Sequence, residues 1–318
     1  MSVLIAIRGA GDNWNADPWK VRFRERLPGR ALLFPDEAME RRGEIRYAAV
    51  WKPEPGLLAR FPALEIIFNL GAGVDALLTD DTLPEVPLVR VVDADLTKRM
   101  SEYVALHCLL YHRQHRRFVA QQAVRTWDAP DQWAAGAVRV GLLGLGELGR
   151  DSAEVLSRIG FQVAGWSRSP KSLPGITCFH GRDGLTAFLA RTDILVALIP
   201  LTPDTQGILD RKLLAGLARD GVLGKPVLIN AGRGGLQVES DILAALDDGT
   251  LGGATLDVFE TEPLPYDSRL WNHPLVTVTP HNAADSSPGA ITDYVAAQIL
   301  DHEGGRPLRH VVDRDKGY

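Results

Sequence analysis

The chain has few cysteines, no long apolar run and no excess of positive charge. Only two of its 318 residues are cysteines, Cys108 and Cys178, and they lie far apart in segments that we expect to be a helix and a loop. Neither a disulfide framework nor a metal cluster is therefore predicted, and a reducing cytoplasm is expected. No run approaches the roughly 20 apolar residues of a membrane span. The net charge of −5 offers no footprint for nucleic acid or an anionic membrane.

The N-terminal segment MSVLIAIRGAGDNW begins like a strand and lacks the basic start and long apolar core of a signal peptide. A basic run at 112–117, HRQHRR, looks like the exposed face of a helix, which favours a solvated surface or a subunit contact over nucleic-acid binding. With 45% hydrophobic and 24% charged residues, the composition is that of a soluble globular protein long enough for two domains.

The most informative segment runs from Val138 to Arg150 and reads VRVGLLGLGELGR, an apolar strand that passes through a GxGxxG turn into a helix. Glycines at these positions allow a sharp turn, a close approach of the backbone to a pyrophosphate and tight packing of the helix on the strand. The first N–H groups of the helix then point at the phosphates. A second strand, FQVAGW, follows at the βαβ distance and supports a dinucleotide site. The residues predicted to bind the cofactor here are Gly144, Gly146, Glu147, Leu148 and Gly149.

The end of that second strand indicates which dinucleotide binds. NAD-binding units place Asp or Glu there to hold the ribose hydroxyls, whereas this strand ends in Ser167 and Arg168. A hydroxyl and a guanidinium can hold a 2′-phosphate that a carboxylate would repel, and Lys171 follows nearby, so NADPH is predicted to be preferred over NADH. The alternative is that Arg168 and Lys171 are solvated loop charges. Pro200 and Asp257 complete the predicted cofactor-binding residues.

Short apolar strands alternate with helical segments along the whole chain, which predicts an α/β fold with two Rossmann-like domains and parallel sheets. The first strands are expected at 3–9, 30–35, 47–52, 65–70 and 87–92, with helical stretches at 17–27 and 57–61. Six strands of a nucleotide-binding domain are expected from 138 and at 161–166, 193–200, 226–233, 253–258 and 276–281. A long helix over 98–127 connects the two series, a helix over 289–300 runs back, and the cleft between the domains is the expected active site.

Three polar residues stand at the ends of predicted strands, where ligands meet open α/β sheets. Arg233 lies in INAGRGG, and its planar guanidinium can hold a carboxylate or polarise a carbonyl. His281 is suited to proton transfer near neutral pH, and Glu262 in FETEPLP could orient its ring and favour the imidazolium. The alternatives are a surface ion-pair arginine, a loop carboxylate and a structural histidine.

An ordered set of motifs carries a family resemblance. The motifs are LGAGVD at 70–75, GLLGLGELG at 141–149, LIPLTPDTQGIL at 198–209, the segment 229–265 from INAGRGG to FETEPLP, and VTPHNAA at 278–284. Together they resemble the D-isomer-specific 2-hydroxyacid dehydrogenases over nearly the whole chain. YAAVWKP, GWSRSPKSLPG and the closing VDRDKGY are most similar to the glyoxylate/hydroxypyruvate reductases of that family.

The resemblance implies roles for residues that match the family's motifs. Arg233, Glu262 and His281 become the catalytic set, and the backbone of Gly71, Ala72, Gly73 and Val74 helps to bind the substrate carboxylate. It also implies a discontinuous substrate domain at 1–97 and 286–318, a dinucleotide-binding domain at 98–285, and a homodimer. The 98–127 segment is expected to form much of the dimer contact, because its apolar residues surround more of the helix than one domain face needs. These residues are Val104, Leu106, Leu109, Leu110, Phe118 and Val119.

The expected activity is NADPH-dependent reduction of a small 2-oxo acid, with Arg233 binding the substrate and His281 giving the proton. Trp51, Lys52 and Met100 are predicted to shape the substrate pocket. Asn282, where many members have an aliphatic residue, and the stretch 95–100 depart from the family's pattern and leave the substrate open. Phenylpyruvate, phosphoglycerate or formate are alternatives, and so is a corepressor that senses dinucleotides through protein contacts.

Overall fold

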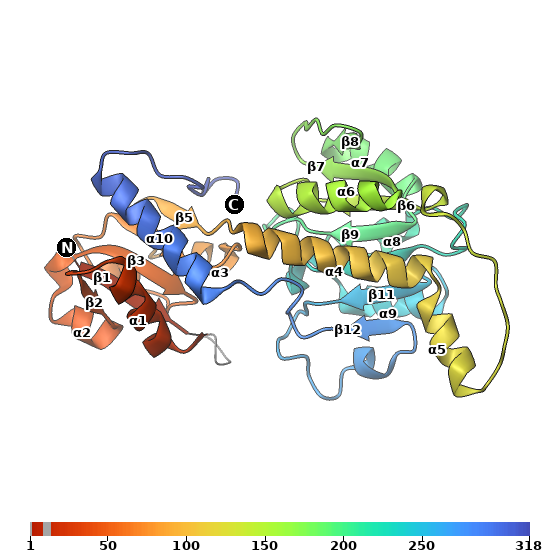
Figure 1. Ribbon diagram of the computed structural model, residues 1–318, viewed down its shortest axis with the longest axis horizontal. Helices are drawn as coiled ribbons and strands as arrows, with labels where there is room; N and C mark the ends of the chain where they lie inside the picture. The colour runs from red at the N-terminus through yellow and green to blue at the C-terminus, as the bar shows by residue number, and fades with distance from the viewer. Residues whose placement is uncertain (1, 9–13) are drawn as a thin grey trace. The chain divides into compact units, whose positions relative to one another are not determined.

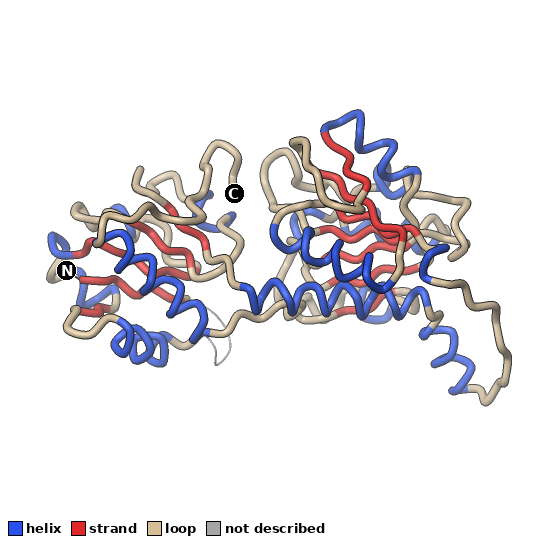
Figure 2. The backbone as a smooth tube through the Cα atoms, turned by 45° about the horizontal axis from the view of Figure 1, so that its top comes forward, coloured by secondary structure: helices blue, strands red, loops and turns tan. Residues whose placement is uncertain are grey.

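The computed structural model describes residues 2–8 and 14–318, and the chain divides into two compact units (Figure 1). The first comprises Met1–Leu96 with Ser286–Tyr318, and the second comprises Thr97–Asp285. Each unit is built on one sheet whose strands pair in parallel, so the prediction of two parallel-sheet α/β domains is confirmed. Figure 2 shows the strands of each unit gathered into one sheet with helices around it. Among the described residues, no helix has the length and apolar character needed to cross a membrane.

The first unit has a five-stranded sheet in the order β2-β1-β3-β4-β5. Its strands are β1 (Ser2–Ile7), β2 (Ala31–Leu33), β3 (Ile45–Trp51), β4 (Ile66–Asn69) and β5 (Leu88–Arg90). Its helices are α1 (Ala16–Arg26), α2 (Pro35–Met39), α3 (Asp75–Leu78) and α10 (Pro288–Glu303), with 3-10 turns η2 (Arg42–Glu44) and η3 (Leu58–Arg60). The helix predicted at 57–61 is thus only a 3-10 turn, and Gly9, the last residue of the first predicted strand, lies outside the described residues.

Successive residues of a strand point to opposite faces of the sheet, and each face of this sheet carries a hydrophobic core. Val3 and Ile5 pack with Trp19 and Phe23 of α1 and with α10, whereas Leu4 belongs to the core on the other face. Figure 1 shows α10 beside α1, so a helix from the C-terminal part of the chain packs with one from the N-terminal part. The C-terminal segment therefore completes the core of the N-terminal unit.

The second unit has a seven-stranded sheet in the order β12-β11-β10-β9-β6-β7-β8. Its strands are β6 (Arg139–Leu143), β7 (Gln162–Ser167), β8 (Thr177–His180), β9 (Ile194–Ala197), β10 (Val227–Asn230), β11 (Gly253–Leu256) and β12 (Val276–Val278). Its α-helices are α4 (Ala94–His112), which begins in the first unit, α5 (His115–Ala123), α6 (Glu147–Ile159), α7 (Gly181–Ala190), α8 (Arg211–Ala215) and α9 (Glu239–Asp247). The 3-10 turns are η4 (Ala135–Ala137), η5 (Gly234–Leu236) and η6 (Arg269–Asn272).

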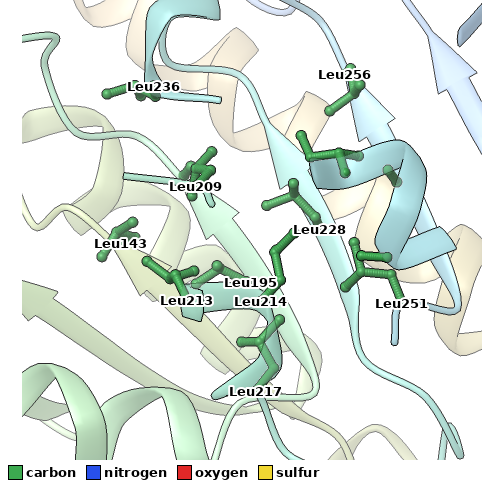
Figure 3. Packing of buried hydrophobic residues seen from close by; sticks show 14 of the residues in the cluster. Leu143, Leu195, Leu209, Leu213, Leu214, Leu217, Leu228, Leu236, Leu251 and Leu256 are labelled. Atoms are coloured by element: carbon green, nitrogen blue, oxygen red, sulfur yellow. The ribbon is translucent and has the colours of Figure 1, made fainter. Parts of the chain in front are cut away.

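Leucines from the strands and the covering helices form the core on one face of this sheet (Figure 3). Leu143 of β6 and Leu228 of β10 belong to it, and Leu214 of α8 packs among them. Their strand neighbours Leu142 and Ile229 face the opposite core with α4 and α6. Burial on both faces explains why these strands are continuous apolar runs and could be read from the sequence.

Three details of the second unit differ from the predictions. The 98–127 helix is two helices, because Gln114 adopts the left-handed conformation at φ 52° and interrupts the regular hydrogen bonding. The six predicted strands are present, but a seventh, β8, lies at the sheet edge and contains Cys178, which was expected in a loop. The basic run is partly engaged, since Arg116 donates to the Thr277 hydroxyl at 2.7 Å.

Candidate active site

The glycine-rich turn joins β6 to α6 and leaves open space above its second glycine. Gly144 has φ 118°, a conformation suited to glycine, and a Cβ on Gly149 would stand 1.9 Å from the Gly144 carbonyl oxygen. A Cβ on Gly146 would meet nothing within 4 Å. Gly146 is the N-cap of α6 and no side chain caps it, so the first N–H groups of the helix, those of Glu147 and Leu148, point out of its end. The fold itself therefore requires glycine at 144 and 149, whereas Gly146 leaves the surface above the turn open to a phosphate.

The loop after β7 holds the residues predicted to read the 2′ position of the adenosine ribose. Ser167 is buried at the end of the strand, and its hydroxyl donates to the Ser169 carbonyl at 2.7 Å. Arg168 and Lys171 are exposed, and an Arg168 nitrogen lies 3.9 Å from an Asp204 carboxylate oxygen. Both side chains of that pair are solvated, at 45% and 84% exposure, so it binds the guanidinium weakly. The Arg168 side chain is 45% exposed, so an anion can reach it from the solvent.

Pro200 lies exposed just beyond β9, in a loop closed by threonine hydroxyls. Thr205 donates its hydroxyl to the Pro200 carbonyl at 2.7 Å and accepts from the Thr202 N–H at 2.8 Å. β9 neighbours β6 in the sheet, so this loop and the glycine turn follow adjacent parallel strands. Ligands of open α/β sheets bind at this edge, outside the carboxyl ends of the strands.

Arg233 follows β10 in a loop that a buried asparagine shapes. The Asn230 side-chain oxygen accepts from the Gly232 N–H at 3.1 Å, and its amide donates to the Arg233 carbonyl at 3.1 Å and to Gln237 at 2.8 Å. A Cβ on Gly234 would stand 1.8 Å from the Phe259 carbonyl oxygen, so only glycine fits there. Sequence reasoning missed Asn230, although a polar residue ending the apolar run VLIN was a usable signal.

Glu262 and His281 lie together as predicted. His281 Nδ1 is 2.7 Å from Glu262 Oε2, and the other carboxylate oxygen of Glu262 accepts from the Phe259 N–H at 3.1 Å. The His281 side chain is 47% exposed and that of Glu262 is 32% exposed, so the pair is open to a ligand. An Nδ1–H donated to the carboxylate orients the ring and leaves Nε2 as the outward atom.

Asp257 follows β11 and is 1% exposed. One oxygen of its carboxylate accepts from the Thr279 hydroxyl at 2.6 Å and from the Asn282 N–H at 3.0 Å, and the other accepts from the Ala283 N–H at 3.0 Å. Its main-chain carbonyl accepts from the His281 N–H at 2.8 Å. Asp257 was predicted to touch the cofactor, and the structure places its carboxylate inside the loop that carries His281.

The predicted carboxylate-binding loop of the first unit follows β4. The buried Asn69 amide donates to the carbonyls of Gly71 and Gly73, both at 2.8 Å. A Cβ on Gly71 would stand 2.1 Å from the Trp51 ring, so the indole lies directly on this glycine. With two carbonyls held by Asn69, the backbone from Gly71 to Val74 keeps a fixed bend in which Ala72 and Gly73 remain partly exposed.

Trp51 is one layer of an aromatic stack. Its ring lies 4.5 Å from that of Trp14, which in turn stacks on Trp19 at 5.5 Å. The exposed Lys52, at φ 45°, places its ammonium 5.6 Å from the centroid of the Trp51 ring. Trp51 and Lys52 were predicted to shape the substrate pocket, and this stays a prediction. Trp14 was not predicted, because nothing in the sequence marks it before the fold is known.

Met100, which was predicted to shape the substrate pocket, is 5% exposed and packs in the core of the second unit with Val104. A separate cavity of about 420 Å³ opens beside the His281 loop on the same unit. It is lined by Arg99, Glu102, Tyr103, Leu106, Asn282, Ala283 and Asp285.

The parallel sheet, the glycine turn and the histidine–carboxylate pair at its carboxyl edge define an α/β dinucleotide-binding protein equipped for proton transfer. Residues 105–283 match the model of the D-isomer specific 2-hydroxyacid dehydrogenase, NAD binding domain. The chain belongs to the D-isomer-specific 2-hydroxyacid dehydrogenase family, and the predictions of this family and of a nicotinamide-dinucleotide-dependent enzyme are confirmed.

Similar proteins extend over the whole chain. Glyoxylate/hydroxypyruvate reductase A of Serratia proteamaculans (strain 568) is 40% identical over 311 residues, covering 96% of this chain and 97% of its own. The NADPH-dependent glyoxylate/hydroxypyruvate reductase of Sinorhizobium meliloti, solved with NADP and sulfate, is 48% identical with a TM-score of 0.92, covering 100% of this chain and 99% of its own. A probable 2-hydroxyacid dehydrogenase of Rhizobium etli CFN 42, solved with NADP, HEPES and L(+)-tartaric acid, is 43% identical with a TM-score of 0.93 and the same coverage.

Proposed function

We propose that this protein reduces small 2-oxo acids with NADPH, turning glyoxylate into glycolate and hydroxypyruvate into D-glycerate. The observation that carries the proposal is the 2.7 Å contact between His281 and Glu262 at the same sheet edge as the glycine turn. The names of the Serratia and Sinorhizobium relatives support the choice of substrates.

The second unit is assigned to the dinucleotide. The open space over Gly146 and the N-terminus of α6 fit a pyrophosphate, and the exposed charges of Arg168 and Lys171 fit a 2′-phosphate. The NADP in the Sinorhizobium and Rhizobium structures supports the same choice. When bound, NADPH supplies the hydride that adds to C2 of the substrate.

The first unit is assigned to the substrate. The N–H groups of the loop Gly71–Val74 are proposed to bind the substrate carboxylate. The carbonyl oxygens of Gly71 and Gly73, which would repel an anion, are already held in hydrogen bonds by Asn69. The guanidinium of Arg233 is proposed to hold the same carboxylate and to stabilise the charge that develops on the carbonyl oxygen. Trp51, pressed on Gly71, limits the room beside this loop and favours a small substituent at C2.

His281 is proposed as the proton donor in the direction of reduction. Its Nδ1–H faces Glu262, so the proton that it gives is on Nε2. The hydride and this proton together convert the C2 carbonyl into an alcohol, and the imidazole is left neutral. The Glu262 carboxylate, 2.7 Å from Nδ1, holds the ring in this orientation.

A homodimer is also proposed. Apolar side chains are exposed on α4, α5 and the segment after them, namely Leu106, Phe118, Val119, Val124 and Trp127. Val104 is buried within its own unit and does not contribute. Exposed apolar side chains in such number on neighbouring elements are typical of a protein contact. Light scattering should give twice the mass of one chain at micromolar concentration, and Leu106→Glu with Val119→Glu should give a monomer; a wild-type monomer would refute the proposal.

The test of the proposed function is an initial-rate panel of glyoxylate, hydroxypyruvate, pyruvate and phenylpyruvate with NADPH and with NADH. We expect the highest kcat/KM for the first two acids with NADPH. A higher value for phenylpyruvate would contradict the substrate assignment and leave the reductase assignment standing. No turnover of any of the acids would overturn the proposal.

A further inference from the structure

Helix α4 reaches the His281 loop through one tyrosine. The Tyr103 hydroxyl lies 2.8 Å from the Thr279 hydroxyl, 176 residues away in sequence, and Thr279 in turn donates to Asp257 at 2.6 Å. Thr279 stands two residues before His281. A chain of three side chains therefore runs from the helix to the carboxylate that holds the loop.

The direction of the hydrogen bonds in this chain follows from the chemistry of the groups. An ionised carboxylate only accepts, and Asp257 accepts from one hydroxyl and two N–H groups. Thr279 has a single hydroxyl proton, which goes to Asp257, so Tyr103 must donate to Thr279. Burial raises the pKa of Tyr103, which keeps its hydroxyl protonated and able to donate. All the protons thus point toward Asp257, an arrangement in which each bond strengthens the next.

The loop needs such support because His281 has an unfavourable backbone conformation. Its φ is 54°, in the left-handed region that a residue with a Cβ adopts only when its surroundings impose it. Asp257 supplies those surroundings, with its carbonyl bound to the His281 N–H and its carboxylate bound to the N–H groups of Asn282 and Ala283. A shift of Asp257 would move the His281 ring away from Glu262.

We propose that Tyr103 and Thr279 are positioning residues for His281, acting through Asp257 to hold the imidazole against Glu262. This inference rests on the proposed function for its kinetic consequence but not for its structural one. The proton donor must stand at a defined place relative to the reacting carbonyl, and a displacement of about 1 Å can cost on the order of a hundredfold in rate.

The same helix offers a matched control. Tyr111 lies eight residues after Tyr103 on α4, and its hydroxyl is 3.0 Å from the hydroxyl of Thr255 in strand β11. Both pairs join a helix tyrosine to a threonine of the sheet unit, but only Thr279 touches the carboxylate that holds the loop. Loss of either pair should therefore affect stability similarly, and only the Tyr103 pair should affect His281.

The experiment compares Tyr103→Phe and Thr279→Val with Tyr111→Phe and Thr255→Val, in the full-length protein. Melting temperature and NADP binding by calorimetry establish that each variant is folded. The measurements are kcat and KM for glyoxylate with NADPH, and the downfield proton NMR signal of the His281 Nδ1–H bonded to Glu262, identified by its loss in His281→Ala. Thr279→Ser restores the hydroxyl without the methyl group.

We expect Tyr103→Phe and Thr279→Val to lower kcat by about tenfold or more, with little change in KM, and to broaden the Nδ1–H signal. Thr279→Ser and the two control variants should keep both. Equal losses in the test and control pairs, or an unchanged signal in Tyr103→Phe and Thr279→Val, would overturn the inference. If the wild-type protein reduces no 2-oxo acid, the proposed function fails, and the NMR signal still decides this inference. If Thr279→Val does not fold, Tyr103→Phe and Thr279→Ser decide it.

Discussion

Two parts of the second unit are built in opposite ways. Buried polar side chains shape the loops after β10, β11 and β12. Six hydrogen bonds of the Asn230 and Asp257 side chains are described above, and five of them join backbone or hydroxyl groups of these loops. The loop after β7 instead exposes its charges, and the contact of Arg168 with Asp204 is long and solvated. The first part resists change, and the second can be altered at little structural cost.

The residues proposed to place His281 and the residues proposed to select the cofactor therefore lie in different loops of this fold. The proposed proton donor, His281, must be placed accurately, and its loop is held by groups whose loss would leave buried polar atoms unpaired. A 2′-phosphate is recognised mainly by charge, and an exposed guanidinium is sufficient for that. Changes in the buried loops should therefore alter turnover, and changes in the exposed loop should alter cofactor choice.

The largest effect is expected from removing the proposed catalytic side chains. His281→Ala and Arg233→Ala should each lower kcat/KM for glyoxylate by at least about a hundredfold, because proton donation or charge stabilisation is lost. NADPH binding, measured by fluorescence titration, should stay within a few-fold. The exposed His115 and Arg158 provide matched alanine controls. Retention of most of the activity in His281→Ala would remove this residue from its role.

The next effect is expected in the exposed loop. Arg168→Asp should reverse cofactor preference, because a charge-assisted contact with the 2′-phosphate, worth on the order of 1.5–3 kcal/mol, becomes a repulsion. The measurement is kcat/KM for NADPH and for NADH in the same preparation. Arg158→Asp makes the same charge change at the far end of α6 and should leave the preference unaltered. Equal efficiencies of the two cofactors in the unmodified enzyme would count against this reading of the loop.

A smaller effect is expected when only the charge beside His281 is removed. Glu262→Gln keeps a group of the same size but replaces the charge-assisted contact with His281 Nδ1, 2.7 Å long in the parent protein, by a weaker neutral one, so the ring is held less firmly. The reductive kcat should therefore fall by about tenfold, with little change in NADPH binding. Glu260→Gln, in the same loop but bonded to the Glu239 N–H, is the control. An unchanged kcat in Glu262→Gln would exclude Glu262 from this role.

The smallest effect concerns the pH dependence of folding stability, through a buried histidine beside Tyr103. His107 packs 4.3 Å from the Tyr103 ring, and burial lowers its pKa below the ordinary value of 6.5. The unfolded chain takes up this proton as the pH falls below about 6.5 and the folded chain does so only at lower pH, so folding stability declines in that window. His107→Gln should lessen the loss of unfolding free energy between pH 7.5 and 5.5, measured in urea, by up to about 1 kcal/mol. His115→Gln should not change it, and an equal loss in parent and His107→Gln would contradict the prediction.

The sequence was informative about the sheets because buried parallel strands are apolar runs, and about the glycine turn because backbone geometry restricts those positions. It did not reveal β8, an edge strand whose Thr177 and His180 are exposed and which has no apolar run to mark it. The break at Gln114 was also hidden, since neither glycine nor proline stands there.

The sequence pointed to the residues of the candidate site but not to the contacts that hold them. Arg233, Glu262 and His281 are recognisable by residue type and by the motifs around them. The contact of Tyr103 with Thr279 joins residues far apart in sequence, and no local pattern announces it. Asp257 shows the same limit, because its place after a strand suggested a ligand while its carboxylate is bound to the neighbouring loop.

The most direct test of the central claim follows the hydride itself. NADPH deuterated on one face or the other of C4 is incubated with the enzyme and glyoxylate, and the glycolate is analysed by mass spectrometry and NMR. We predict that one of the two labelled forms transfers deuterium to C2 of glycolate and that the other does not. Glycolate formed without deuterium from either form, or no glycolate at all, would contradict it.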